Sequence, residues 1–175
     1  YPAAIFGVAW TESERNAIGI YTVEIDNTNF KNQKWYINTA VSYSFGSGKV
    51  TASYGSATAR AHADTLFTQA DEDNGLGTKD DVKEKGLKSI LIQQIKDQAK
   101  SILDETDWYI TRKAEKSTAI PSSITTHRDA VRTKQASMIT AITNASDTPA
   151  LETLYTYTTT DGVTSRPLGE LPTLS

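Results

Sequence analysis

Two amphipathic stretches between residues 80 and 145 constrain the fold of this chain more than any other feature. In each stretch, apolar residues recur at spacings of three, four or seven, which places them on one face of a helix. Each helix needs a partner for its apolar face, so we expect the two to pack as an antiparallel hairpin. The apolar positions are Leu87, Ile90, Leu91, Ile95, Ile102 and Leu103 in the first stretch, and Ile124, Val131, Met138 and Ile142 in the second.

Residues near the ends of both stretches favour helix termini. Asp80 or Asp81 can cap the first helix, because a carboxylate accepts hydrogen bonds from the free N–H groups at the positive end of a helix dipole. Pro121-Ser122-Ser123 ends the connector and offers a hydroxyl cap to the second helix. Gly86 costs about 1 kcal/mol relative to Ala inside a helix. The first turn therefore frays, or the helix starts later.

Residues 1–26 predict a strand, a short helix and a second strand. Ala3–Ala9 is an apolar run suited to a buried strand. Thr11 and Glu14 have the spacing of a capping box, and Gly19 can adopt the positive φ that often follows the end of a helix. Ile20–Asp26 is rich in β-branched residues and favours a strand.

A β-hairpin is predicted over residues 34–54. Lys34–Phe45 and Lys49–Tyr54 are rich in aromatic and β-branched residues, and Gly46-Ser47-Gly48 separates them as a turn. Alternate residues of an unbroken first strand would share one face. We expect that face to point into the core; its residues are Trp35, Ile37, Val41, Tyr43 and Phe45.

The residues that follow the hairpin predict a link to the helical part of the chain. Ala57–Ala70 is alanine-rich with a weak apolar stripe, which indicates a connecting helix. Asp71–Gly77 is acidic, but an EF-hand loop with its central glycine at Gly75 would need Ala70 as its first calcium ligand. We therefore predict a solvated loop there.

The pattern as a whole predicts an α+β protein. The expected fold is a small N-terminal antiparallel sheet with a short helix, then a helical hairpin and an extended C-terminal arm. The expected divisions are a β-rich domain at residues 1–58, a connecting helix and loop at 59–79, the hairpin at 80–147, and a short helix, strand-like segment and arm at 148–175.

Composition argues against several classes of function. The formal net charge of -3 comes from interspersed signs, so we expect no binding to nucleic acid or to a membrane surface. The absence of cysteine excludes disulfides and thiolate chemistry. No apolar run is long enough to span a membrane, and residues 1–20 do not have the pattern of a signal peptide.

No catalytic constellation is evident in the sequence. The chain has two histidines, His62 and His127, far apart in sequence, and we expect both to face solvent. There is no glycine-rich phosphate loop, no His-x-x-x-His pair and no Gly-x-Ser-x-Gly motif. We therefore expect no enzymatic activity, no catalytic residue, no metal site and no cofactor.

Six short motifs follow one another along the chain. They are Trp10-Thr11-x-x-Glu14-Arg15-x-x-Ile18-Gly19-Ile20, Thr106-Asp107-Trp108-Tyr109, Arg112-Lys113-Ala114-Glu115, Ala119-Ile120-Pro121, His127-Arg128-x-x-Val131-Arg132 and Arg166-Pro167-Leu168-Gly169-Glu170-Leu171-Pro172. These motifs resemble a group of tailed-bacteriophage proteins of the tail-fibre-assembly type, and the second half of the chain resembles that group more closely than the start does. His127 departs from the pattern, because the group usually has an aromatic residue, commonly Tyr, at that place.

The resemblance implies a virion protein of the phage tail, made in the cytoplasm of the host bacterium. Its partners would be other tail, fibre or baseplate proteins, and it would be present in multiple copies of a symmetric assembly. The resemblance brings no catalytic residue. Two alternatives stay open: an assembly chaperone that is not retained in the particle, and a carbohydrate-binding module that uses exposed aromatic residues among Trp35, Tyr36, Tyr43 and Tyr54.

The connector of the hairpin has an expected structural role. Thr106 or Asp107 can bond to free backbone N–H groups, and Trp108 can close the open end of the hairpin with a large apolar surface. We expect charged residues to tie the connector to the second helix by ion pairs. These residues are Arg112, Glu115, Arg128 and Arg132.

The C-terminal residues predict an arm that contacts another subunit. Thr148-Pro149 reads as the cap and first turn of a short helix through Leu154, followed by a strand-like Tyr155–Thr160 and a turn at Asp161-Gly162. Residues 166–175 combine prolines with leucines, a composition suited to an extended segment laid on a neighbour. The expected contact residues are Tyr155, Tyr157, Arg166, Leu168 and Leu171.

Overall fold

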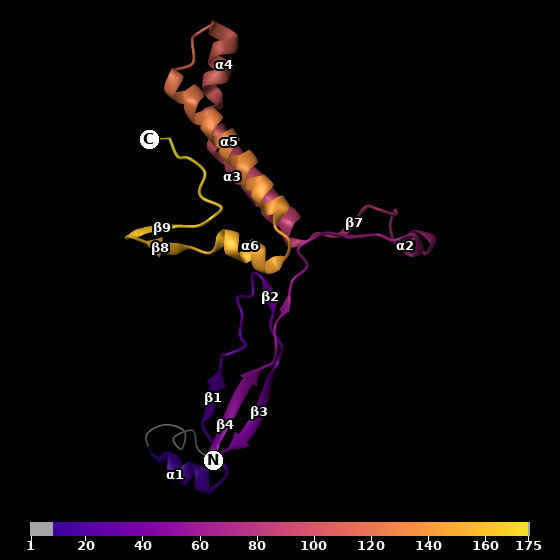
Figure 1. Ribbon diagram of the computed structural model, residues 1–175, viewed down its shortest axis with the longest axis vertical. Helices are drawn as coiled ribbons and strands as arrows, with labels where there is room; N and C mark the ends of the chain where they lie inside the picture. The colour runs from indigo at the N-terminus through magenta and orange to yellow at the C-terminus, as the bar shows by residue number, and fades with distance from the viewer. Residues whose placement is uncertain (1–8, 175) are drawn as a thin grey trace. The chain divides into compact units, whose positions relative to one another are not determined.

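The computed structural model describes residues 9–174 and has the predicted α+β fold, with several small sheets and a helical C-terminal region (Figure 1). The chain divides into two compact units after Ala59, and each is described by itself. The strand expected at residues 3–9 falls, except for Ala9, outside the described residues.

The N-terminal unit begins with a short helix at the predicted place. Helix α1 (Glu12–Ala17) has the capping box: the Thr11 side chain accepts from the Glu14 N–H, and the Glu14 carboxylate accepts from the Thr11 N–H. Gly19 follows with a φ of +79°. Both the cap and the stop of this helix are therefore confirmed.

A three-stranded sheet forms the body of the N-terminal unit. The predicted hairpin is confirmed, because β3 (Val41–Gly46) pairs with β4 (Lys49–Tyr54) in antiparallel register. Strand β1 (Val23–Asp26) pairs with the other edge of β4 and runs parallel to it. The expected all-antiparallel sheet is wrong, because the chain continues past β1 through a loop before it turns back as β3.

The expected long strand over Lys34–Phe45 is broken in two. Strand β2 (Tyr36–Ile37) leaves the three-stranded sheet and pairs with β5 (Thr58–Ala59). The break lies at Asn38, whose side chain accepts from the Lys31 N–H at 2.9 Å and donates to the Lys31 carbonyl at 2.7 Å. These local bonds replace the ladder of a continuous strand.

The helix expected over Ala57–Ala70 is wrong. This part of the chain contains β5, the strand β6 (Thr65–Leu66) and the start of the short helix α2 (Gln69–Asp73). Strand β6 pairs with β7 (Val82–Glu84) to form a ribbon. The alanine-rich composition favours a helix, but the pairing of β5 with β2 and of β6 with β7 overrides this local preference.

Asp71 explains why the acidic segment folds as a capped turn. Its carboxylate accepts from the N–H and hydroxyl of Thr68, at 2.9 and 2.8 Å, and from the Lys83 ammonium at 2.7 Å. The bond to Lys83, followed by the bonds to Thr68, lowers the pKa of Asp71 to about 2. The solvated loop expected at Asp71–Gly77 is thus partly helical.

Lowering the pH should release the Asp71 interactions only in strong acid. A carboxyl whose pKa falls on folding contributes stability at pH above its ordinary value of 3.8, and that contribution is lost as the pH falls through about 2. Carbon-detected NMR titration of Asp71 should therefore give a midpoint near 2. Lys83→Ala should raise the midpoint, whereas a wild-type midpoint near 3.8 would contradict the geometry.

The predicted helical hairpin is confirmed in the second unit. Helix α3 (Leu87–Asp104) and helix α5 (Ser122–Asn144) lie side by side along their lengths (Figure 1). Their facing side chains form the core of this unit together with α6 (Thr148–Tyr155). The buried apolar residues are Leu87, Leu91, Ile95, Ala99, Ile124, Val131, Met138, Ile142, Ala145, Leu151 and Leu168.

The first helix of the hairpin starts later than Asp80 or Asp81 would require. Gly86 is the N-cap, and its N–H donates to the Asp64 carboxylate at 2.7 Å. A Cβ at Gly86 would meet the Ala63 carbonyl oxygen at 2.2 Å, so only glycine fits. The cap expected at Asp80 or Asp81 is therefore wrong; of the two alternatives left open, the helix starts later.

The C-terminal segment begins with the expected short helix and hairpin. Asp147 caps α6, and the Thr148 hydroxyl donates to the Arg60 carbonyl at 2.6 Å instead of capping the helix. Strands β8 (Thr158–Thr160) and β9 (Val163–Ser165) then pair across the predicted turn.

Candidate functional site: the connector, the C-terminal segment and the sheet face

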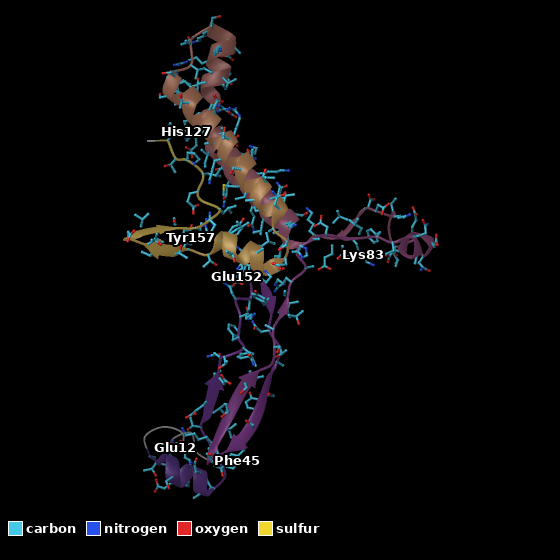
Figure 2. All side chains as sticks on the ribbon, viewed as in Figure 1. Glu12, Phe45, Lys83, His127, Glu152 and Tyr157 are labelled. Carbon is cyan, nitrogen blue, oxygen red and sulfur yellow. The ribbon has the colours of Figure 1, made fainter. Side chains whose placement is uncertain are left out.

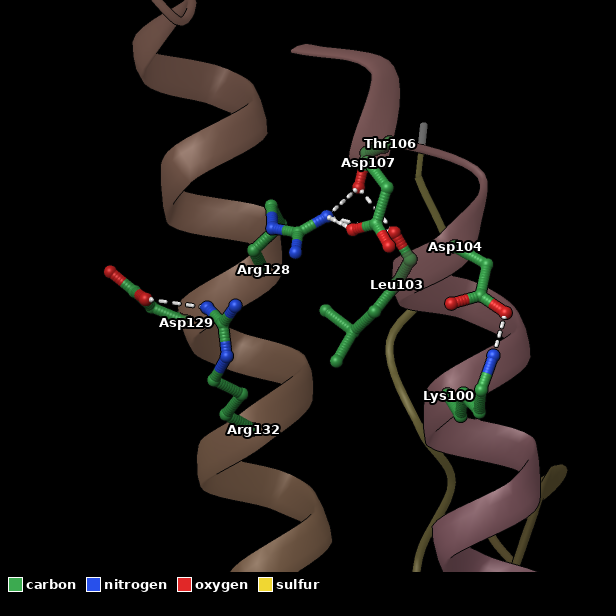
Figure 3. Close-up of polar contacts among 8 residues, drawn as sticks. All are labelled: Lys100, Leu103, Asp104, Thr106, Asp107, Arg128, Asp129 and Arg132. Carbon is green, nitrogen blue, oxygen red and sulfur yellow. Dashed lines mark hydrogen bonds and ion pairs between the residues drawn. The ribbon is translucent and has the colours of Figure 1, made fainter. Parts of the chain in front are cut away.

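Arg128, on α5, makes the main polar contacts between α5 and the connector (Figure 3). Arg128 is 7% exposed, and one nitrogen of its guanidinium donates to the Leu103 carbonyl at 2.8 Å and to the Thr106 hydroxyl at 2.6 Å. The same nitrogen lies 2.8 Å from an oxygen of the Asp107 carboxylate, which is half exposed. Arg128 thus satisfies the carbonyl at the end of α3 and holds α5 to it.

The other charged residues of the connector act differently from the expected ion pairs. Arg132 pairs with Asp129 of its own helix at 3.3 Å. Arg112 lies over the rings of Trp108 and Tyr109. Glu115 is exposed and makes no ion pair within residues 9–174. Of the expected set, only Arg128 ties the connector to the second helix.

Trp108 does not close the end of the hairpin, so this expectation is wrong. The connector is itself a helix, α4 (Asp107–Lys116), and Trp108 is 51% exposed on it. The buried connector residue is Thr106, whose small side chain fits beneath Arg128. Trp108 instead packs against Tyr109, with ring centroids 3.8 Å apart.

Trp108→Ala should therefore cost about 1 kcal/mol of unfolding free energy, the value of a surface aromatic contact. Urea denaturation followed by the helical circular dichroism signal would measure this. A loss of 3 kcal/mol or more would mean that the indole is buried in solution.

The C-terminal contact residues are largely engaged within the chain. The Arg166 guanidinium lies over the rings of Tyr155 and Tyr157 and bonds the Glu170 carboxylate at 2.7 Å. The Tyr157 hydroxyl donates to the same carboxylate at 2.5 Å (Figure 2 labels Tyr157). That bond raises the pKa of Tyr157. This cluster fixes the segment after β9 to the hairpin before it.

The segment after β9 also packs on its own unit. Leu168 is buried, and its N–H donates to the Leu154 carbonyl at 3.0 Å. Leu171 is half-buried and lines a shallow groove with residues of α3 such as Ile102. Leu168 therefore lies away from any surface that another chain could reach.

One face of the three-stranded sheet is apolar, and among the described residues most of its side chains are exposed, although Ala52 at its centre is buried. The register places two rows of side chains on it: Val23, Val50 and Phe45, then Ile25, Ala52 and Tyr43. Tyr43 is 66% exposed and Phe45 is 61% exposed, and Val23 and Ile25 are also exposed. The opposite face carries Ser, Thr and charged residues, including the Glu24–Lys49 ion pair at 2.5 Å.

The expectation that this face points into the core is therefore wrong for Ile37, Tyr43 and Phe45, which are exposed, and holds for Trp35. Val41, Tyr43 and Phe45 do share a face, but Ile37 lies in a different sheet and is exposed. Trp35 and Tyr36 are buried. The two aromatic residues thus cannot form the open platform that a carbohydrate-binding module would use.

The two histidines occupy different environments. His62 is half-buried. His127 on α5, expected to face solvent, is only 9% exposed, so this expectation is wrong; the residue lines a groove together with Thr173 and Leu174. Among residues 9–174, no group of three or more His, Asp or Glu side chains could hold a metal ion.

The fold is that of an α+β protein with a helical hairpin. Its C-terminal segment packs on its own unit, and one face of its three-stranded sheet is apolar and largely exposed within the described residues. Comparison with protein-family models, curated proteins and solved structures gave no match. Within the described residues, no helix is both long enough and apolar enough to cross a membrane.

Proposed function

We propose that this protein is a structural component of a bacteriophage tail, associated with a fibre, the baseplate or a tail adaptor, and that it acts through contacts with other proteins. The single observation that carries the proposal is the apolar face of the sheet formed by β1, β4 and β3. The resemblance of the connector motifs to tail-fibre-assembly proteins supplies the phage context.

The apolar face has the character of a surface that another chain covers. Isolated exposed apolar residues are common, but here aliphatic and aromatic side chains form two adjacent rows. Such a face is what two sheets bury when they pack against each other. Its occupant in the proposal is a second copy of this chain, which presents the same face to its partner.

Sedimentation analysis of the full chain tests the contact. The wild-type protein should form an oligomer, and Phe45→Glu should make it monomeric, because the new charge would be buried in the interface. Ser44→Glu is the matched control, since the neighbouring residue lies on the polar face. A wild-type monomer, or equal loss of assembly in both variants, would contradict this contact.

Mass spectrometry of purified phage particles tests the role in the tail. A structural component should be present in a fixed ratio to known tail proteins. Detection in the infected-cell lysate but not in particles would favour the assembly chaperone instead, and absence from both would reject the phage assignment.

A further inference from the structure

The segment that joins the two strands of the β6–β7 ribbon contains an Asn-Gly pair, Asn74-Gly75. In such a pair the backbone nitrogen of the glycine can attack the side-chain carbonyl carbon of the asparagine, because glycine has no Cβ to crowd the approach. Asn74 is exposed, and a Cβ built on Gly75 would meet no atom within 4 Å. The pair therefore has both the sequence and the access to solvent that deamidation requires.

The deamidation of Asn74 would consume only water. The Gly75 nitrogen forms a bond to Asn74 Cγ, the bond between Cγ and Nδ2 breaks, and the proton of the Gly75 nitrogen leaves with the amide group as ammonia. The intermediate is a cyclic succinimide. Water then opens either carbonyl of this ring and leaves an aspartate or an isoaspartate at position 74, with one new negative charge.

The folded turn opposes the closure of this ring. The backbone ψ of Asn74 is 3°, so the Asn74 nitrogen eclipses the Gly75 nitrogen at the place where the ring needs Cβ. In addition, Asn74 Nδ2 donates to the Ala70 carbonyl at 2.6 Å, and the Gly75 N–H donates to the Glu72 carbonyl at 2.9 Å. The reaction therefore requires that the end of α2 opens first.

Helix α2 is held by few contacts. It has five residues, and none of them is buried. Its N-terminus is held by the capping box of Thr68 and Asp71, and the 2.7 Å bond from Lys83 to Asp71 ties it to the second strand of the ribbon. Segments with few buried contacts open at a low cost in free energy. The opening of α2 is therefore the step that limits access to the reactive geometry.

We propose that Asn74 is a deamidation site, that the opening of α2 sets its rate, and that the contact between Lys83 and Asp71 slows the reaction by holding α2 closed. The product weakens the turn, because it loses the donor to the Ala70 carbonyl and places a negative charge at the C-terminal end of a helix. The neighbouring carboxylate of Asp73 adds repulsion. The site does not depend on the proposed place in a phage tail.

Peptide mass spectrometry of the full chain, incubated at mildly alkaline pH, tests the site. Chromatography before the mass measurement separates peptides with asparagine, aspartate or isoaspartate at position 74. The same chain in guanidinium chloride, at the same pH and temperature, gives the rate without the fold. The folded chain should react about tenfold to a hundredfold more slowly, as expected for a segment that opens locally at low cost.

Two variants and one control test the role of the helix cap. Lys83→Ala should speed the reaction of the folded chain about twofold to fivefold, the range for loss of a partly exposed ion pair. Thr68→Val should also speed it, because it removes the hydroxyl of the capping box. Lys79→Ala is the matched control and should react as the wild type does, because Lys79 has the same charge but the bond to Asp71 comes from Lys83. The helical circular dichroism signal shows that each variant is folded, and in guanidinium chloride all three should react at the wild-type rate.

Several results would overturn the proposal. Equal rates in the folded and unfolded chain would show that the turn gives no protection. A folded chain without product, when the unfolded chain is fully modified, would show that α2 does not open to the reactive geometry. If Lys83→Ala reacts no faster than Lys79→Ala, the contact with Asp71 does not slow the reaction, and the same result from Thr68→Val would reject control by α2. Modification of another asparagine in place of Asn74 would reject the site.

Discussion

Arg128→Ala should lower the free energy of unfolding of the C-terminal unit by about 3 kcal/mol. The substitution removes the donor that serves the Leu103 carbonyl and the Thr106 hydroxyl, and Thr106 is buried. It also leaves space between α3 and α5 that the alanine side chain cannot fill. Urea denaturation followed by helical circular dichroism would measure the loss, since most of the helix lies in this unit.

Arg132→Ala is the matched control for Arg128. Arg132 lies one turn further along α5, and its side chain is half exposed and, among residues 9–174, paired only with Asp129. An exposed ion pair contributes little, so its removal should cost about 0.5 kcal/mol or less. Arg128→Lys should be intermediate, because an ammonium group cannot reproduce the planar fork of donors. Equal costs for both alanine variants would show that the contacts of Arg128 with Leu103 and Thr106 do not hold the hairpin together.

Leu91→Ala should cost about 2 to 5 kcal/mol, the range for truncation of a buried leucine. Leu91 is 1% exposed and lies on the face of α3 that contacts α5. Ile90→Ala is the control, because the neighbouring residue is 41% exposed and should cost about 1 kcal/mol or less.

The comparison between Leu91 and Ile90 also tests the helical register. Both residues belong to the predicted apolar stripe, yet the structure buries only one of them. A larger loss from Ile90→Ala than from Leu91→Ala would mean that α3 is rotated about its axis relative to the described hairpin.

The periodicity of apolar residues was enough to predict the helical hairpin, but it was not enough to predict how the strands pair in the sheets. Ile124, Val131, Met138 and Ile142 are all buried, because a repeat of seven or four residues records a helix face directly. The parallel partner of β1 could not be predicted in this way. Strand pairing depends on hydrogen bonds between residues distant in sequence, and no local pattern distinguishes a parallel neighbour from an antiparallel one.

The candidate site was predicted only in part, for a related reason. The connector motif located Thr106 and Arg128, but large apolar size alone suggested that Trp108 would be buried. The structure closes the connector with a threonine and an arginine instead, because the guanidinium reaches the end of α3. The burial of His127 was not predicted, because a polar residue at the edge of the apolar stripe of its helix favours an exposed position.

The parallel pairing of β1 with β4 sets an order of assembly during synthesis. Strands β3 and β4 adjoin a tight turn, and such hairpins form within about 1–10 μs. Strand β1 leaves the ribosome before either of them, yet its partner in the described sheet is β4. Strand β1 therefore stays without its partner strand while the ribosome adds about two dozen further residues to the chain, at about 5–20 residues per second. Glu24 and Asp26, alternating with its apolar residues, protect the waiting strand from pairing with other nascent chains.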